Sequence, residues 1–480
     1  MEVNPNDHSV RVEKSAFQVG SAFRIQADVV VASPTTFYCP GQVAFHSGRI
    51  VEVSDQVDQA AHISLAGYAL LPGLVNAHTH LEFSDLRAPL PPGEDFPQWI
   101  GSVLAARLGR SAAGASHLLD ALAAGLRESR DFGVAAVVDI VTPPWSPEHL
   151  GRAALMSLDD SSASVDEKKN RLPSLLSHLL NADEYQLLQR HLPPLVSMPR
   201  VVACLEQLGL TTARIETATQ WRRHVESVER AGWPANLHSL GLSPHAPYST
   251  PSELWQATLH DAAEQNKLAA MHVAESPAER CWIDDGTGPF AQLHQRLGVA
   301  EVKRSATLVA DLAMALASVP YALLIHGNYL TECEIDAIAN VRDRVTVVYC
   351  PRTHQHFQHD PYPLAALRQR GIRVVLGTDS RSSNPDLNLW MEARAALEDH
   401  PSFTPLDALA SITEQAASAC GLQSDFGTLQ EGKLAAMCAI PLERDELTKA
   451  QQSANLNTVD LRNWLLARWF TRLEHPIGLF

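Results

Sequence analysis

The chain has 480 residues, and its 38 Lys and Arg against 54 Asp and Glu give a formal net charge of −16. Because no basic run or Arg-rich stripe interrupts this acidic balance, the long-range field repels phosphate backbones and anionic lipid. We therefore expect neither nucleic acid nor a membrane as a partner. The length fits one barrel of roughly 250 residues or more with an accessory domain, or two to three smaller domains.

Cysteine usage and the first residues of the chain concern its compartment. Seven cysteines stand far apart, without Cys-x-x-Cys spacing, which favours buried free thiols in a reducing cytoplasm. The opening "MEVNPNDHSVRVEKSAF" lacks the apolar core of a signal peptide, and nowhere do about 18 apolar residues run together. We expect a soluble, cytoplasmic protein, and the composition leaves a homo-oligomer open.

Residues 22 to 70 are typical of short strands broken by turns, as in "FRIQADVVVAS" and "HISLAGYALLPG". After residue 425, "FGTLQEGKLAAMCAIPL" returns to the same style. We expect residues 1–70 and 421–480 to form one small β-sandwich domain from both chain ends. The stretch "LRNWLLARWFTRLEHPIGLF" has a helix-like apolar stripe that includes Leu465 and Trp469, and packing on the sandwich or on a second subunit explains it better than a membrane does.

From residue 71 the pattern changes to compact apolar runs that alternate with amphipathic, helix-like stretches. Continuous apolar runs are typical of strands buried on both faces in a parallel sheet. Eight such units over residues 71–420 predict a (β/α)8 barrel of the TIM type. The runs are 70–80 ("LLPGLVNAHTH"), 133–141, 199–210, 240–248, 268–275, 321–328, 344–354 and 372–380.

Three helix starts are marked by capping boxes at Thr250-Pro-Ser-Glu253, Ser276-Pro-Ala-Glu279 and Thr331-Glu-Cys-Glu334. In the first two, a proline is expected at the first helical position. One interval departs from the repeat: residues 153 to 195 contain "LDDSSASVDEKKNR". We interpret this interval as a surface loop in preference to a lid.

Polar residues end several of the predicted strands, where the reacting groups of such barrels lie. His78 and His80 close the first run and, at i and i+2, can place two imidazoles on one ion. His272 ends the fifth run, and Asp379 ends the eighth. Three imidazoles and a carboxylate suit one divalent metal ion, with zinc as the first choice and iron as the alternative.

Two further residues fit the chemistry of such an ion. A bound divalent ion lowers the pKa of a water ligand to about 7, so that hydroxide becomes available at neutral pH. Glu275, one helical turn after His272, can shuttle a proton to the substrate, and His326, at the end of the sixth run, can orient the water. Asp379 can also accept a proton. The second His-x-His, His354-Gln-His356, follows a strand end without alternation, and we interpret it as loop lining first and ligand second.

With these residues in place, the chain resembles the amidohydrolase superfamily over nearly its whole length. The matching stretches are "PGLVNAHTHLEFS", "GLSPHAPYS", "HVAESPAE", "LIHGNYL", "CPRTH" and "GTDSRSSNPDLNLWMEAR". It is similar to the deaminase and chlorohydrolase branch, which includes cytosine, guanine, adenosylhomocysteine and aminodeoxyfutalosine deaminases.

The resemblance implies His78, His80, His272 and Asp379 as metal ligands, Glu275 as the acid/base and His326 as the catalytic histidine beside the metal. His245 in "SPHAPYS" matches a substrate-contacting histidine of nucleoside-type deaminases. Glu82 and Arg352 also face the predicted mouth. For these last three residues, substrate contact and a plain loop role are equally good interpretations.

Relatives with two metals, such as hydantoinases and dihydroorotases, bridge them with a carbamylated lysine from the fourth strand. Here the lysines between residues 15 and 266 are Lys168 and Lys169, both inside the polar interval, so a single ion is expected. The resemblance therefore implies hydrolytic deamination of a purine, nucleoside-like or other N-heterocyclic small molecule. The alternatives are hydrolysis of a C–Cl bond or a cyclic amide on the same fold, or a non-catalytic barrel.

Overall fold

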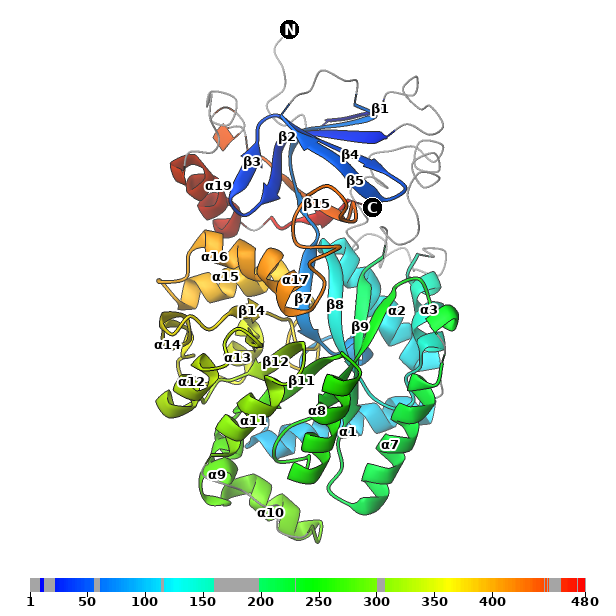
Figure 1. Ribbon diagram of the computed structural model, residues 1–480, viewed down its shortest axis with the longest axis vertical. Helices are drawn as coiled ribbons and strands as arrows, with labels where there is room; N and C mark the ends of the chain where they lie inside the picture. The colour runs from blue at the N-terminus through cyan, green and yellow to red at the C-terminus, as the bar shows by residue number, and fades with distance from the viewer. Residues whose placement is uncertain are drawn as a thin grey trace.

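The computed structural model describes residues 9–12, 22–55, 61–113, 116–158, 198–228, 230–299, 307–443, 445–446, 448, 459–472 and 474–479. Two bodies stacked end to end make up the fold, a barrel and a smaller β domain (Figure 1). Of the polar interval predicted as a surface loop, residues 153–158 belong to helix α3, and the remainder lies outside the described residues. In the described part of the chain, no helix is both long enough and apolar enough to cross a membrane.

Eight strands form one sheet in the order of the chain, with parallel pairing throughout. The predicted (β/α)8 barrel is therefore confirmed, and each strand falls on a predicted apolar run. The strands are β7 (Leu74–Thr79), β8 (Val134–Val141), β9 (Arg200–Gln207), β10 (Leu237–Pro244), β11 (Leu268–Val273), β12 (Tyr321–His326), β13 (Val345–Tyr349) and β14 (Val374–Leu376).

Helices surround the barrel, because one face of each strand must be covered by apolar side chains from outside (Figure 1). One large apolar cluster joins these helices to the outward-facing strand residues. The helices are α1 (Phe96–Ala113), α2 (Ser116–Asp131), α3 (Pro147–Leu158), α7 (Thr212–Glu226), α8 (Ser252–Glu264), α9 (Pro277–Asp285), α10 (Gly288–Arg296), α11 (Leu308–Leu316), α12 (Glu332–Ala339), α13 (Pro351–His356), α14 (Leu364–Gln369), α15 (Leu389–Asp399), α16 (Pro405–Ser411) and α17 (Glu414–Ala419).

Strand alternation explains how the barrel interior presents its polar residues. On β9, Cys204 belongs to the inner apolar cluster, while its neighbours Ala203 and Leu205 belong to the outer one. On β11, Ala270 lies in the inner cluster. The next inward position on each strand is polar, Glu206 on β9 and His272 on β11, because side chains two residues apart share a face. The barrel is thus apolar inside and becomes polar where its strands end.

The barrel closes between the first and last strands by a few hydrogen bonds. The backbone N–H groups of Thr378 and Asp379 donate to the carbonyl of His78 at 3.1 Å each. In return, His80 N–H donates to the carbonyl of Asp379 at 3.2 Å, and the Thr79 hydroxyl donates to the same carbonyl at 2.8 Å. This seam joins two segments that supply site residues.

The small domain is built from both chain ends, as expected. Its strands form one continuous eight-stranded sheet in which β15 pairs antiparallel with β6. On β6, Leu70 faces a separate apolar cluster, whereas Ala69 and Leu71 join the cluster that continues into the barrel. The strands are β1 (Ser9–Val12), β2 (Phe23–Ser33), β3 (Thr36–Tyr38), β4 (Gly41–His46), β5 (Arg49–Ser54), β6 (Ile63–Pro72), β15 (Met437–Pro441) and β16 (Ile477–Gly478).

Helix α19 (Val459–Thr471) joins the two bodies. The Trp469 ring stacks on Phe37 of the small domain with centroids 6.2 Å apart, and Phe470 stacks on Trp390 of α15 with centroids 4.0 Å apart. The helix-like stripe predicted in this stretch therefore packs within the chain. Its buried face is wider than predicted, because Phe470 is buried as well as Leu465 and Trp469.

The three predicted helix starts have different outcomes. At Thr331 both bonds of the capping box form. At Ser276 the hydroxyl accepts from Glu279 N–H, but the Glu279 carboxylate accepts from Glu275 N–H instead of returning to Ser276. The prediction at Thr250 was wrong: α8 begins at Ser252, because the Thr250 hydroxyl donates to the carbonyl of Gln207.

The seam between β7 and β14 leaves room for no side chain at Gly377. A Cβ there would lie 2.8 Å from His78 Cβ and 3.0 Å from His78 N and O. We expect Gly377→Ala to lower the free energy of unfolding by about 1–3 kcal/mol, because the backbone at this contact cannot move without opening the seam. Urea unfolding measures the effect.

Gly101 provides the matched control. It lies on the exposed face of α1, and a Cβ there meets nothing within 4 Å. Gly101→Ala should be neutral or stabilising by up to about 1 kcal/mol, since alanine is the better helix former. Equal unfolding midpoints for the two variants would contradict the steric account of the seam.

Candidate active site

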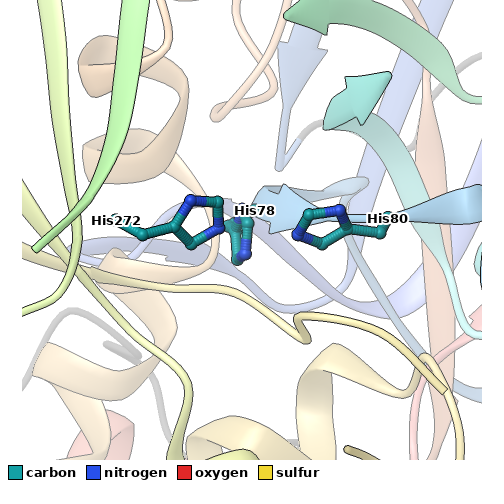
Figure 2. A group of neighbouring side chains, drawn as sticks. All are labelled: His78, His80 and His272. Carbon is teal, nitrogen blue, oxygen red and sulfur yellow. The ribbon is translucent and has the colours of Figure 1, made fainter. Parts of the chain in front are cut away.

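Three histidines meet where β7 and β11 end. His78, His80 and His272 each offer a ring nitrogen, and these nitrogens lie within 4.8 Å of one another. The ring of His78 is 4.9 Å from that of His80 and 5.1 Å from that of His272, measured between centroids. Figure 2 shows the three rings side by side, with the His78 ring between those of His272 and His80. The structure therefore brings together the imidazoles that the sequence predicts as ligands.

Their protonation state suits a cation. Burial, followed by repulsion between neighbouring rings, lowers the pKa of His78 and His80 well below the ordinary value and that of His272 to about 4. The rings are therefore neutral at pH 7, with lone pairs available. Both nitrogens of His78 and Nδ1 of His80 are buried without a hydrogen-bond partner in the structure. Buried polar atoms rarely stay unsatisfied, so this donor set fits a divalent metal ion.

Asp379 completes the group from the opposite side of the seam. Its Oδ1 lies 3.4 Å from His78 Nε2 and 3.7 Å from His80 Nε2. The Ser383 hydroxyl donates to Oδ2 at 2.8 Å, which leaves Oδ1 turned toward the histidines. The Asp379 backbone has φ 55°, in the left-handed region that an aspartate adopts at a cost. Such a conformation persists only where the surrounding structure enforces it, here at the seam.

The orientation of His272 is set by β10. Its Nδ1 donates to the carbonyl of His245 at 3.0 Å, so Nε2 is the nitrogen left for a ligand role. His245 is itself oriented by Ser249, whose hydroxyl lies 2.5 Å from His245 Nδ1. Burial, followed by the positive charge of Arg107, lowers the pKa of His245 to about 4.

Glu275 and His326 form a second pair beside the histidines. Oε1 of Glu275 lies 3.3 Å from Nε2 of His326, and both side chains are buried. Burial raises the pKa of Glu275 well above its ordinary value, and the charges of Asp379 and Glu279 add to the effect. His326 follows Ile325, an inward residue of β12, and would point outward in a regular strand. Its φ of 68° breaks that alternation and redirects the ring.

These groups open on one pocket. Its lining includes His80, His272, Glu275, His326 and Asp379. The outer wall is apolar and comes mainly from two helices that contact each other, α1 and α10. The wall residues are Phe96, Trp99, Ile100, Val103 and Leu104 from α1, Phe290 and Leu293 from α10, and Leu297, which follows α10 directly.

Among the pocket residues that were missed from the sequence, two are charged groups close to the histidines. Glu206 on β9 and Arg107 on α1 both line the cavity. Burial raises the pKa of Glu206 to about 7, against the lowering effect of Arg107 and His272. The position of Glu206, two residues after the inward Cys204, was a usable signal. Arg107 carried none, because its role depends on how α1 folds back over the barrel.

Glu82 lies behind the pocket wall and is not among the lining residues. Its carboxylate accepts two hydrogen bonds from Arg107, at 2.7 and 3.0 Å, and one from the Thr142 hydroxyl at 3.1 Å. The structure thus gives Glu82 a contact with the arginine that reaches the cavity. A direct contact with substrate is not supported by this position.

Arg352 also stays outside the pocket lining. Its Nε donates to Glu392 Oε1 at 2.6 Å, its backbone N–H donates to Glu392 Oε2 at 2.9 Å, and Nη2 donates to Asp386. Of the two interpretations open in the sequence, the structural role therefore fits Arg352. The His-x-His at His354 and His356 lies on helix α13 instead of a loop, and its Nε2 atoms contact the carbonyls of Asp360 and Leu90.

The two His-x-His motifs predict different metal contents. We expect His80→Ala to hold well below one ion per chain after expression with added zinc, because it removes one of three converging imidazoles. His356→Ala should keep about one ion, since its ring contacts a carbonyl of the protein. Mass spectrometric metal analysis distinguishes them. Equal metal contents would mean that the three histidines are not the ligands.

The Arg352 network predicts a loss of stability. Glu392 is fully buried, so Arg352→Met would leave its carboxylate without a cation, although the backbone N–H of residue 352 and the Asn384 amide still donate to it. We expect the free energy of unfolding to fall by about 3 kcal/mol. Arg370 pairs with Glu332 and Asp336 on the surface, and Arg370→Met should remain close to the wild type. Urea unfolding compares the two. A stable Arg352→Met protein that binds substrate poorly would restore the substrate role.

Comparison with known proteins agrees with this site. The amidohydrolase family matches residues 69–461. A 5'-deoxyadenosine deaminase from Methanothermobacter thermautotrophicus is 26% identical over 422 residues, which cover 85% of this chain and 82% of that protein.

Two solved structures share the fold. The aminofutalosine deaminase of Helicobacter pylori, in complex with methylthio-coformycin, matches with a TM-score of 0.69 at 20% identity, covering 95% of this chain and 97% of that one. An adenosine deaminase from Xanthomonas campestris with bound zinc matches with a TM-score of 0.61 at 20% identity, covering 91% and 90%. Because the family match spans most of the sequence and the fold agrees, the chain belongs to the amidohydrolase family.

Proposed function

We propose that this protein is a metal-dependent aminohydrolase that deaminates a purine, nucleoside-like or other N-heterocyclic small molecule. The observation that carries the proposal is the arrangement of two groups in one pocket: three neutral imidazoles beside Asp379, and a buried carboxyl–imidazole pair next to them. The reaction adds water to an amino-substituted ring carbon and releases ammonia.

His78, His80, His272 and Asp379 would hold one divalent ion, and zinc is our choice over iron. Histidine nitrogens and carboxylate oxygens are both ordinary zinc ligands. When bound, such an ion lowers the pKa of water and polarises the reacting carbon. A single ion is favoured because β10, the fourth barrel strand, carries no lysine that could bridge two.

Glu275 is assigned the proton transfers. A carboxyl whose pKa lies well above its ordinary value can hold a proton near neutral pH and give it up again. Its Oε atoms would take a proton from the attacking water and deliver it to the departing nitrogen, which leaves as ammonia only after protonation. Glu279 fixes the start of this segment by accepting the Glu275 backbone N–H at 2.8 Å.

His326 is assigned to orientation of the attacking water. Its ring touches Glu275, and its carbonyl accepts a hydrogen bond from the Tyr362 hydroxyl at 2.9 Å, which holds its unusual backbone conformation. Burial lowers the pKa of His326 well below the ordinary value, so the ring is neutral. A neutral imidazole can accept from water or donate to the substrate.

Relatives support deamination over the alternatives. Three curated sequence relatives are named as deaminases, of 5'-deoxyadenosine, of aminodeoxyfutalosine and of 5-methylthioadenosine or S-adenosylhomocysteine. Solved structures that share the fold include both deaminases and an atrazine chlorohydrolase. Hydrolysis of a C–Cl bond needs no protonation of the leaving group, so the buried Glu275 would have no proton to deliver to it. A non-catalytic barrel would be expected to lose ligands, whereas the predicted ligands and Glu275 all line or adjoin one pocket here.

Glu275→Gln tests the assignment. The amide keeps the size of the side chain but cannot carry the proton, so we expect ammonia release to fall by about 10²-fold to 10⁴-fold while the metal content stays at the wild-type level. Glu216→Gln makes the same chemical change at an exposed position of α7 and should retain full activity. Turnover by Glu275→Gln at the wild-type rate would refute the proton shuttle.

A further inference from the structure

Glu206 is a buried carboxylate that accepts no hydrogen bond from any residue in the described part of the chain. It ends β9 with 4% of its surface exposed and lines the pocket beside the three histidines. No residue that the structure describes donates a hydrogen bond to its carboxylate oxygens; its nearest ring nitrogen, His245 Nε2, lies 3.9 Å away. The side chain of Glu206 lines the cavity, so a molecule that enters the pocket can supply donors to its oxygens.

The two polar groups nearest to Glu206, His245 and Arg107, form hydrogen bonds with other residues. Ser249 occupies Nδ1 of His245, which turns Nε2 toward Glu206. Arg107, the nearby cation of the pocket wall, is held by two hydrogen bonds to Glu82. Neither group supplies the missing donors at hydrogen-bond distance. The acceptor face of Glu206 is therefore directed at the cavity.

Glu206 lies close to the residues that are proposed to act on the substrate. Its carboxylate oxygen, a nitrogen of His245 and a nitrogen of His272 lie within 4.8 Å of one another. His272 also belongs to the group that faces Asp379 and Glu275 in the same pocket. If the reacting carbon of a substrate lies beside His272, Asp379 and Glu275, another part of its ring, or the first substituent on that ring, lies beside Glu206.

We propose that Glu206 is a specificity-determining residue whose carboxylate accepts hydrogen bonds from N–H or O–H donors of the substrate. This proposal rests on the proposed function. The donors are either an amino group or neighbouring hydroxyls, because N–H and O–H groups both donate hydrogen bonds to a carboxylate oxygen. The apolar wall from α1 and α10 takes the less polar part of the same molecule.

The residues around Glu206 also meet the criteria for a metal site, which is the rival explanation. Glu206, His245 and His272 form a second candidate group. However, His272 belongs to both groups and its Nδ1 is already bonded to the carbonyl of His245, so it has one nitrogen to offer. That nitrogen serves the His78 and His80 group. A role of Glu206 in binding a substrate donor therefore explains its position better than a second metal site does.

The test compares Glu206→Leu and Glu206→Gln with wild type and with the exposed control Glu216→Gln. Two matched pairs of compounds distinguish the donors: adenosine against 2',3'-dideoxyadenosine for hydroxyls, and 2-aminoadenosine against adenosine for an amino group. Ammonia release gives kcat/KM. Calorimetric Kd values in the Glu275→Gln background report binding without turnover, and metal analysis is run on every variant.

We expect wild type to prefer the donor-bearing member of one pair by about 10²-fold or more, because its absence leaves the carboxylate unpaired. In Glu206→Leu this preference should fall to within about threefold, with Kd changing in parallel and the metal content unchanged. Glu206→Gln, which keeps one acceptor oxygen, should lie between. Glu216→Gln should match wild type.

Three results would overturn the proposal. The first is that Glu206→Leu weakens the binding of both members of each pair equally. The second is that none of the donor-bearing compounds binds to wild type. The third is that wild type holds two ions per chain and Glu206→Leu holds one. The last result would make Glu206 a metal ligand. Absence of ammonia release by metal-loaded wild type refutes the proposed function separately, because the Kd ratios between Glu206 variants are measured without turnover.

Discussion

The seam that closes the barrel is the constraint on which the site depends. Four hydrogen bonds join the end of β7 to residues 378 and 379, and they hold His78 and His80 against Asp379. The close approach at Gly377 leaves the backbone one arrangement there. Because the ligands of a metal must be held together before it binds, the last barrel contact and the metal site are one feature of the fold.

Around that seam the protein keeps several polar groups in an apolar interior. Neutral imidazoles, a protonatable Glu275 and the unpaired Glu206 are all buried at the strand ends. Each is unfavourable without a partner, and the backbone strain at Asp379 and His326 adds to the cost. The apolar layers inside and outside the barrel, together with the packing of α19 between the two bodies, offset it. The strained residues lie at the strand ends, where the binding of a metal and a substrate would offset the cost.

The barrel could be predicted because its signals are local. Each strand is an apolar run, and the proposed ligands His78, His80 and His272 stand at run ends, so their meeting follows from parallel strands ending at one face. The start of α8 was mispredicted because the Thr250 hydroxyl bonds to Gln207, 43 residues away. A cap signal in the sequence says nothing about such a competing partner.

The sequence by itself determined which residues end the barrel strands, and therefore which imidazoles and carboxylates share one mouth. Only the tertiary structure decided what each polar residue contacts. Arg352 donates hydrogen bonds to Glu392 and Asp386, and Arg107 donates hydrogen bonds to Glu82. Glu206 receives no hydrogen bond from the residues that the structure describes, and it lines the pocket. The physical reason is that strand alternation acts over neighbouring residues, whereas hydrogen-bond partners are chosen across tens of residues by how helices fold over the barrel.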